Sequence, residues 1–147
     1  MLDQRITEDM KTAMKAGNKE ALSAIRMLKS AIKDRQIELR RDMEDEEVLA
    51  LIGKLVKQRR EAARQYADAG RSDLEAKELR EADVYIAYLP EPLSEAELAA
   101  MLETVLSETG AASLKDMGKV MAAMRERAAA RADMGQLSAL VKSRLSA

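Results

Sequence analysis

The sequence predicts an all-α protein made of two helical modules. Ala, Leu, Glu, Lys and Arg are abundant, and aromatic residues make up only 2% of the 147 positions, a composition typical of helical proteins. Apolar residues recur at helical spacing in most of the chain, and no alternation of apolar and polar residues is long enough to predict a strand. We expect a first module of about four helices and a small second module of three helices.

The first module is predicted to span residues 1–89. Glycines end two of its helices, and polar residues that commonly precede helices begin three of them. The expected helices are residues 2–16 before Gly17, 18–43 capped by Asn18, 45–69 capped by Asp45 and ended by Gly70, and 72–88 opened by Ser72 and Asp73.

The segment "YLPEPLSEAEL" predicts the boundary between the modules. Pro90 and Pro92 cannot continue a helix, and each restricts the residue before it to an extended conformation. Ser94 and Glu97 have the spacing of a capping box that restarts a helix. The second module, residues 90–147, is expected to contain helices at 94–109, from Leu114 onward, and from about Gly135 to Leu145.

Composition excludes several classes of site. The chain has no Cys and no His, which removes disulfides, common zinc sites, thiol nucleophiles and the commonest general base. A chain without cysteine fits a reducing compartment, and we expect the protein in the cytoplasm. Its start carries acids and no apolar signal-peptide core, and no apolar run is long enough to cross a bilayer. With three Tyr and no Phe or Trp, platforms for stacking single-stranded bases are nearly missing.

Charge is distributed unevenly along the chain. Residues 1–89 hold 18 basic and 18 acidic residues, residues 90–110 hold five acids and no base, and residues 111–147 hold seven bases and three acids. The basic tail therefore suggests an anionic partner more strongly than the overall net charge of −1 does.

The stretch "KDMGKVMAAM", residues 115–124, concentrates methionines on one helix face. Five apolar residues share that face: Leu114, Met117, Val120, Met121 and Met124. We interpret this stripe as core that packs against Leu98, Leu102, Leu137, Leu140 and Val141. The alternative is a pliable groove for a partner helix. Gly118 lies beside the stripe, where a missing side chain would let a neighbouring helix approach.

Basic residues form rows on three predicted helices. The rows are Arg26, Lys29, Lys33 and Arg40; Lys54, Lys57, Arg60 and Arg64; and, in the tail, Lys115, Lys119, Arg127, Arg131, Lys142 and Arg144. We interpret the first two rows as solvated faces with acids such as Asp34, Glu38 and Glu61 interspersed, and keep phosphate contact as the alternative. In the tail, where acids are few, both interpretations stay open. Phosphate contact would make binding strongly dependent on salt.

Arg59 falls inside the apolar stripe of its predicted helix, near Ile52, Leu55 and Tyr66. A guanidinium there must reach solvent or find a carboxylate. A buried structural ion pair is the preferred interpretation, and a recognition residue is the alternative.

No catalytic motif is present. The chain lacks a Gly-rich phosphate loop and a GxSxG elbow, and its Lys-Ser neighbours at Lys29-Ser30 and Lys142-Ser143 do not face each other on a helix. We therefore expect no cofactor, no metal and no activity of the isolated chain.

Several blocks in order resemble the GatB/YqeY family, in particular its stand-alone bacterial YqeY-type proteins. The blocks are "EDMKTAMKAGNKEALSAIRMLKSAIKDRQIE" (8–38), "VKQRREAARQYADAGRSDLEAKE" (56–78), "YLPEPLSEAEL" (88–98), "KDMGKVMAAM" (115–124) and "RADMGQLSALVK" (131–142). The resemblance implies an all-helical fold of two modules. It also implies that the second module is similar to the tail domain of GatB, the B subunit of the glutamine-dependent tRNA amidotransferase, which contacts tRNA.

The matching tail positions are Lys115, Gly118, Lys119, Arg131, Ala132, Asp133 and Lys142. The chain departs from the family where a proline and a glycine are expected before Ala132-Asp133, since it reads "MRERAAARAD" there. We expect a longer helix from Leu114, and a turn lengthened by Met134.

The leading functional prediction is a non-catalytic accessory protein that binds tRNA or associates with an amidotransferase or an aminoacyl-tRNA synthetase. Lys115, Lys119, Arg131 and Lys142 would neutralise phosphates, and Asp133 would cap or orient the last helix. One alternative is a protein-interaction adaptor that docks through the second and third helices. Another is an auxiliary subunit of a carbon–nitrogen ligase with glutamine as amide donor, the activity that the family implies.

Overall fold

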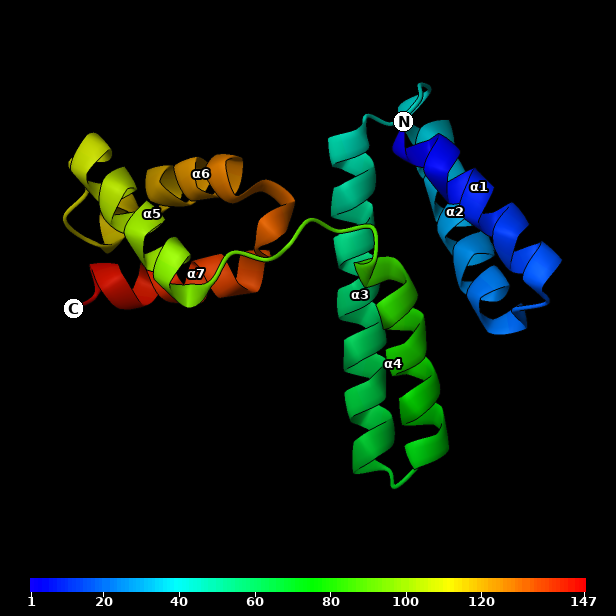
Figure 1. Cartoon of the computed structure of the whole chain (residues 1–147). Helices are drawn as coiled ribbons and strands as arrows, with labels where there is room; N and C mark the ends of the chain where they lie inside the picture. The colour runs from blue at the N-terminus through cyan, green and yellow to red at the C-terminus, as the bar shows by residue number, and fades with distance from the viewer. The chain divides into compact units, whose positions relative to one another are not determined.

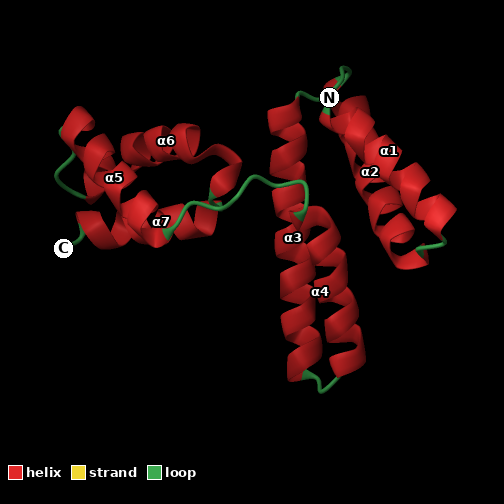
Figure 2. Ribbon diagram, viewed as in Figure 1, coloured by secondary structure: helices red, strands yellow, loops and turns green.

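The computed structural model describes residues 1–147 and contains helices but no strand, which confirms the all-α prediction (Figures 1 and 2). Seven α-helices follow one another: α1 (Leu2–Ala16), α2 (Lys19–Leu39), α3 (Asp45–Asp68), α4 (Ser72–Ile86), α5 (Glu95–Thr109), α6 (Met117–Ala128) and α7 (Met134–Leu145). Two 3-10 turns, η1 (Leu114–Asp116) and η2 (Ala129–Arg131), flank α6.

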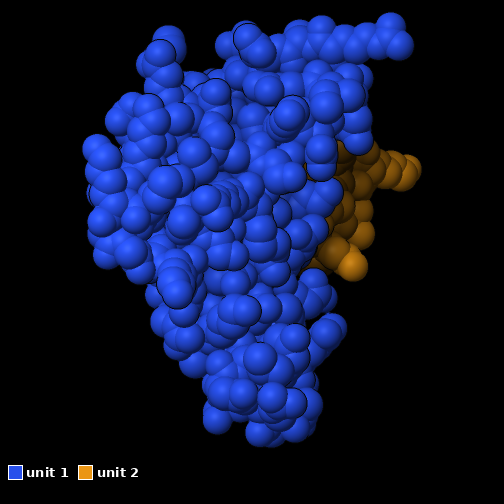
Figure 3. All heavy atoms as spheres, turned by 90° about the vertical axis from the view of Figure 1, so that its right-hand side faces the viewer, with its two compact units in different colours: residues 1–89 blue, residues 90–147 orange.

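The chain divides into two compact units, Met1–Leu89 and Pro90–Ala147, which Figure 3 shows in different colours. Each unit has its own cluster of buried apolar side chains, formed by α1 to α4 in the first and by α5 to α7 in the second. The Pro90–Pro92 segment begins the second unit.

Two helical hairpins, α1–α2 and α3–α4, form the first unit (Figure 1). Each helix contributes a large side chain with 0% exposure: Ile6, Leu28, Ile52 and Tyr85. Burying an aliphatic or aromatic side chain of this size stabilises a fold by about 1.5–3 kcal/mol. The buried Tyr85 hydroxyl donates a hydrogen bond to the Ala24 carbonyl at 2.8 Å, which satisfies the polar end of the ring.

The connection between α2 and α3 differs from the sequence prediction. Helix α2 ends at Leu39 and does not reach Met43, because Arg40 adopts the left-handed conformation with φ 57° and ψ 34°. The cap of α3 is Glu44 and not Asp45. The carboxylate of Asp45 instead accepts a hydrogen bond at 3.2 Å from the N–H of Leu2, so Asp45 serves the first turn of α1.

Glu47 completes the capping box at the start of α3. Its carboxylate accepts the N–H of Glu44 at 3.0 Å and pairs with both terminal nitrogens of Arg41 at 2.8 and 3.0 Å. The Arg41 hydrogen bond, followed by the Glu44 N–H, lowers the pKa of Glu47 to about 2.

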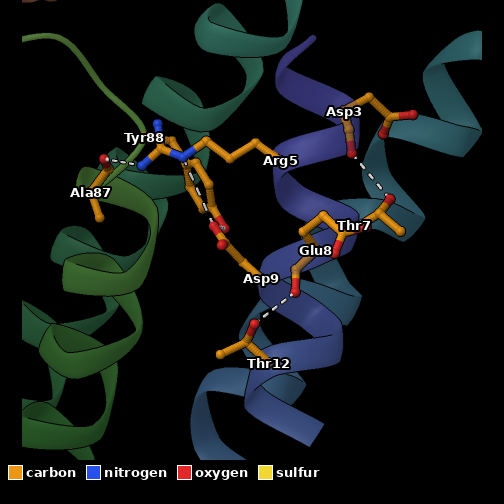
Figure 4. A network of polar contacts seen from close by, with 8 residues as sticks. All are labelled: Asp3, Arg5, Thr7, Glu8, Asp9, Thr12, Ala87 and Tyr88. Carbon is orange, nitrogen blue, oxygen red and sulfur yellow. Dashed lines mark hydrogen bonds and ion pairs between the residues drawn. The ribbon is translucent and has the colours of Figure 1, made fainter. Parts of the chain in front are cut away.

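Tyr88 fixes the end of the first unit (Figure 4). Helix α4 ends at Ile86 and does not reach Tyr88, because the N–H groups of Tyr88 and Leu89 bond to carbonyls three residues back, at 3.1 and 3.0 Å, and tighten the last turn. The Tyr88 hydroxyl donates to the Asp9 carboxylate at 2.6 Å, and the Arg5 guanidinium lies 4.8 Å from the ring centroid. Arg5 also donates to the Ala87 carbonyl at 3.3 Å. Burial and the Asp9 hydrogen bond raise the pKa of Tyr88.

Helix α5 begins as predicted. The Ser94 hydroxyl accepts the Glu97 N–H at 3.1 Å while the Glu97 carboxylate accepts the Ser94 N–H at 3.1 Å, so both halves of the predicted capping box are formed. Helix α5 ends at Gly110, whose φ of 69° is left-handed.

The methionine stripe packs in the core, as predicted, for four of its five members. Val120, Met121 and Met124 are buried with Leu98, Leu102, Leu137 and Val141, and Met117 and Leu140 are half-buried and pack against this cluster. The prediction is wrong for Leu114, which belongs to the 3-10 turn before α6 and is 47% exposed. Gly118 is also misassigned as a close-packing position, since a Cβ added there would meet no atom within 4 Å.

The connection from α6 to α7 differs from both expectations. Helix α6 does not continue through the alanine-rich stretch, because Ala129 has φ 48° and ψ −128°, which ends the helix at Ala128. Met134 does not lengthen the turn and is the first residue of α7. The Asp133 carboxylate accepts the Gln136 N–H at 2.8 Å and caps that helix.

Candidate nucleic-acid interface

Three of the four predicted phosphate ligands gather at one end of the α6–α7 pair. A short connection joins these two helices, which run antiparallel and lie in contact (Figure 1). Lys115 in η1 and Lys119 in the first turn of α6 therefore lie at the same end as Lys142 in the last turn of α7. All three side chains are exposed. Lys115 and Lys142 form no ion pair, and the Lys119 ammonium lies 4.0 Å from the Asp116 carboxylate.

Asp116 holds the backbone that carries these lysines. Its carboxylate accepts the N–H groups of Ala112 at 2.9 Å and Ser113 at 3.4 Å. These backbone hydrogen bonds lower the pKa of Asp116, so the group is ionised at neutral pH. We infer that Asp116 serves the η1 turn first and neutralises Lys119 only in part. The Ser113-x-x-Asp116 spacing is the sequence signal for this cap, with Asp116 at the third position of a capping box.

Gly118 leaves bare backbone between Lys115 and Lys119. It is exposed, and the space where a side chain would stand is empty to 4 Å. It lies in the first turn of α6, which continues directly from η1, and the Met117 N–H there bonds to the Leu114 carbonyl. An anion approaching at Gly118 would meet the positive end of the helix dipole and no side chain at that position.

The fourth predicted ligand, Arg131, lies at the other end of the pair, in the connection between α6 and α7. Its Nε donates to the Glu91 carbonyl at 2.8 Å, and its carbonyl accepts the Leu93 N–H at 2.9 Å. Its guanidinium also lies 3.9 Å from the Glu97 carboxylate. The adjoining Ala132 is extended and half-buried against the core. Arg131 therefore holds the Glu91–Leu93 segment and does not join the lysines.

The acidic and basic segments of the second unit neutralise each other in part. Arg144 of α7 pairs with Glu103 of α5 at 2.7 Å, and Arg127 of α6 pairs with Glu108 of α5. The sequence prediction treated residues 90–110 and 111–147 separately and missed these pairs. Taken together, residues 90–147 contain seven basic and eight acidic residues, so any anion site is local and does not arise from the charge of the whole unit.

Comparison with known proteins places the chain in a family. A family model described as "Yqey-like protein" matches residues 3–145. The chain belongs to the Yqey-like family. It is also 30% identical over 129 residues to "Altered inheritance of mitochondria protein 41, mitochondrial" of Pyrenophora tritici-repentis (strain Pt-1C-BFP), covering 84% of this chain and 71% of that relative. A cytoplasmic location for this chain stays a prediction. The name of the relative places that relative in mitochondria.

The basic rows of the first unit of this Yqey-like chain fall into different environments. Lys29 does not lie with Arg26 and Lys33, because its ammonium donates to the Thr7 hydroxyl at 2.6 Å and lies 3.8 Å from the Asp3 carboxylate, so it ties α2 to α1. Arg26 and Lys33 are exposed and form no ion pair. On α3, Lys54, Lys57, Arg60 and Arg64 are likewise exposed and form no ion pair.

Arg59 occupies a position between α3 and α4. Its guanidinium lies 3.4 Å from the Glu78 carboxylate and 3.5 Å from that of Glu81, and the three side chains are 18%, 15% and 9% exposed. The buried Nε makes no hydrogen bond of good geometry, so the pairing with Glu81 is ionic. This arrangement is the buried structural ion pair that the sequence analysis preferred for Arg59.

No group of three or more Asp or Glu side chains is arranged to hold a metal ion. No helix has the length and apolar character needed to cross a membrane.

Proposed function

We propose that the protein is a non-catalytic accessory protein that binds tRNA through phosphate contacts of its second unit. The supporting observation is the bare first turn of α6 at Gly118, flanked by exposed Lys115 and Lys119, with Lys142 at the same end of the unit. The resemblance to the GatB tail domain supplies the class of ligand. Association with a tRNA-dependent amidotransferase or an aminoacyl-tRNA synthetase is the setting that this resemblance suggests.

In this proposal a phosphate approaches the bare backbone at Gly118 and the positive end of the α6 dipole, and the lysine ammonium groups neutralise adjacent phosphates. A-form RNA offers phosphates and shape more readily than base edges, so the recognition is of backbone and not of sequence. Arg131 orders the chain that enters the second unit and makes no phosphate contact. Asp133 acts through the start of α7.

Gly118 allows a test that separates binding from folding. Gly118→Ala adds a methyl group in open space at a helical position, so it is expected to stabilise the fold by about 0.5 kcal/mol. The same methyl group obstructs an approaching phosphate and is expected to weaken tRNA binding about tenfold. Gly53→Ala on α3 is the matched control, because a Cβ there also meets no atom within 4 Å. Binding that is unchanged in Gly118→Ala would remove the main support for the proposal.

The lysines are tested by their effect on salt dependence. Replacing Lys115, Lys119 and Lys142 by Ala should weaken tRNA binding and reduce the slope of log K against log salt by about 2–3. The control removes three exposed cations of α3 by replacing Lys54, Lys57 and Arg60 with Ala, and should keep the wild-type slope. Equal losses in the two variants would mean that binding follows total charge and not this site.

A further inference from the structure

The solvent-facing side of α2 carries three cations at a spacing of seven residues, Lys19, Arg26 and Lys33, and Arg40 follows as the left-handed cap residue after the helix. The Cα atoms of the three helical residues follow one another at about 10 Å and drift only about 20° around the helix per step, so they form one row. All four are exposed, and none forms an ion pair. Other cations of α2 do find carboxylates, since Lys29 pairs with Asp3 and Arg35 with Glu38.

A shallow groove follows the first half of this row. It has a volume of about 390 Å³ and is lined by Lys19, Leu22, Ser23, Arg26, Met27 and Ser30. The lining contains two cations, two hydroxyls and two apolar side chains, and no acid. Met27 is 45% exposed, and Ile37 further along the same face is 66% exposed. The face is therefore basic and apolar at once.

The row on α3 differs in the residues between its cations. By helical geometry, Glu61 and Asp68 fall on the same side as Lys57 and Arg64, so acids are interspersed with bases there. On α2 no acid falls between the cations, and the exposed Asp34 lies beside the row, between Ile37 and Met27 by helical geometry. The α3 row fits a solvated face of mixed charge, whereas the α2 row leaves a strip of positive charge without a counterpart.

We propose that this face of α2 is a docking surface for an acidic amphipathic helix of a partner protein. A helix with carboxylates every seventh residue would match the cation row over three turns or more, and its apolar side chains would cover Met27 and Ile37. Phosphates match the cations but offer nothing for the exposed apolar side chains. A lipid surface would need apolar depth, which α2 turns into the core through Ile25, Leu28 and Ile32.

This surface is independent of the tRNA site, because it lies in the first unit and shares no residue with it. The charges steer association and fix the register of the two helices, while the apolar contacts slow dissociation.

A fluorescence titration with a designed peptide tests the proposal. The probe is a 21-residue helical peptide with Glu at every seventh position and Leu beside each Glu, and its control is a scrambled peptide of the same composition. Because the chain has no cysteine, Ser30→Cys gives one labelling site in the groove for an environment-sensitive dye. Gln65→Cys on α3 gives a reference site. A saturable signal from residue 30 alone, with the scrambled peptide at least tenfold weaker, is expected.

Variants separate the proposed surface from a phosphate site. Arg26→Glu with Lys33→Glu should weaken peptide binding more than tenfold, whereas Lys57→Glu with Arg64→Glu on α3 should change it less than twofold. Met27→Ser with Ile37→Ser should weaken it severalfold without changing charge. Equal binding of the ordered and scrambled peptides would overturn the proposal. A second pair of results would also overturn it: the variant with Met27→Ser and Ile37→Ser binds the peptide as tightly as wild type, and duplex RNA displaces the peptide. These results would show that the face binds phosphates.

Discussion

Replacing Arg59 by methionine should destabilise the first unit by about 3 kcal/mol. The substitution keeps most of the side-chain volume but leaves the carboxylates of Glu78 and Glu81 without their cation, at 15% and 9% exposure. Removing one partner of a buried ion pair typically costs about 3–5 kcal/mol. The lower end applies because the N···O distances of 3.4 and 3.5 Å are long and Arg59 is 18% exposed.

Urea denaturation followed by tyrosine fluorescence measures this change for the first unit alone, because all three Tyr lie within residues 1–89. Arg59→Met combined with Glu81→Met removes the cation and one of its two carboxylates, leaves Glu78 without its cation, and should recover about 1 kcal/mol of the loss, as a double-mutant cycle would show. A loss below about 1 kcal/mol in Arg59→Met, with no coupling to Glu81, would refute the structural role and favour the recognition role.

Three further predictions concern single contacts. In thermal melts, Ala129→Gly should stabilise the second unit by about 1 kcal/mol, because the backbone angles of Ala129, φ 48° and ψ −128°, favour glycine. The control is Ala122→Gly at an exposed position inside α6, which should destabilise the unit by about 1 kcal/mol in the same melts. Tyr88→Phe should cost about 1 kcal/mol near neutral pH in urea titrations. The folded-state pKa of Tyr88 is raised above the ordinary tyrosine value of 10.0, so wild-type stability is full below about pH 10 and falls above it, and the phenylalanine variant should show less of that fall. The pKa of Glu47 is about 2 in the folded protein, against an ordinary value of 4.5, so the contribution of Glu47 to stability is present above pH 4.5 and lost as the pH falls through 2. Glu47→Gln should therefore flatten the dependence of stability on pH in this range of an acid titration. An unchanged curve would contradict the capping-box account.

Helix positions could be predicted where local chemistry decides them. Ser94 and Glu97 form the predicted capping box because both partners lie within one turn. The failures occur where distant parts of the chain compete for a group. Asp45 does not cap α3, because its carboxylate is taken by the N–H of Leu2, which is 43 residues away. Arg40 ends α2 in a left-handed conformation, which nothing in the sequence "ELRRDM" predicts.

The residue types of the candidate site could be predicted from the sequence. Which of these residues lie at the same end of the helix pair could be read only from the three-dimensional structure. Lys115, Lys119 and Lys142 are brought together by the antiparallel packing of α6 and α7, whereas Arg131 lies at the other end of the pair and is occupied by the Glu91 carbonyl. Charge counts along the sequence could not show that Arg127 and Arg144 meet acids of α5.

The border of the two compact units lies at Pro90, where the sequence predicts a domain boundary. That the units are separate domains stays a prediction. A second unit expressed as residues 90–147 should fold cooperatively on its own, since its buried cluster includes no side chain of residues 1–89.

Binding of labelled tRNA to the whole chain, followed by fluorescence anisotropy over a salt series, decides whether the proposed function holds. If three lysines of the second unit meet phosphates, log K should fall linearly with log salt with a slope of about −3, and the Lys115, Lys119 and Lys142 alanine variant should lose most of that slope. No binding at the lowest salt, or a slope that persists in this variant, would contradict a tRNA-binding role for the second unit.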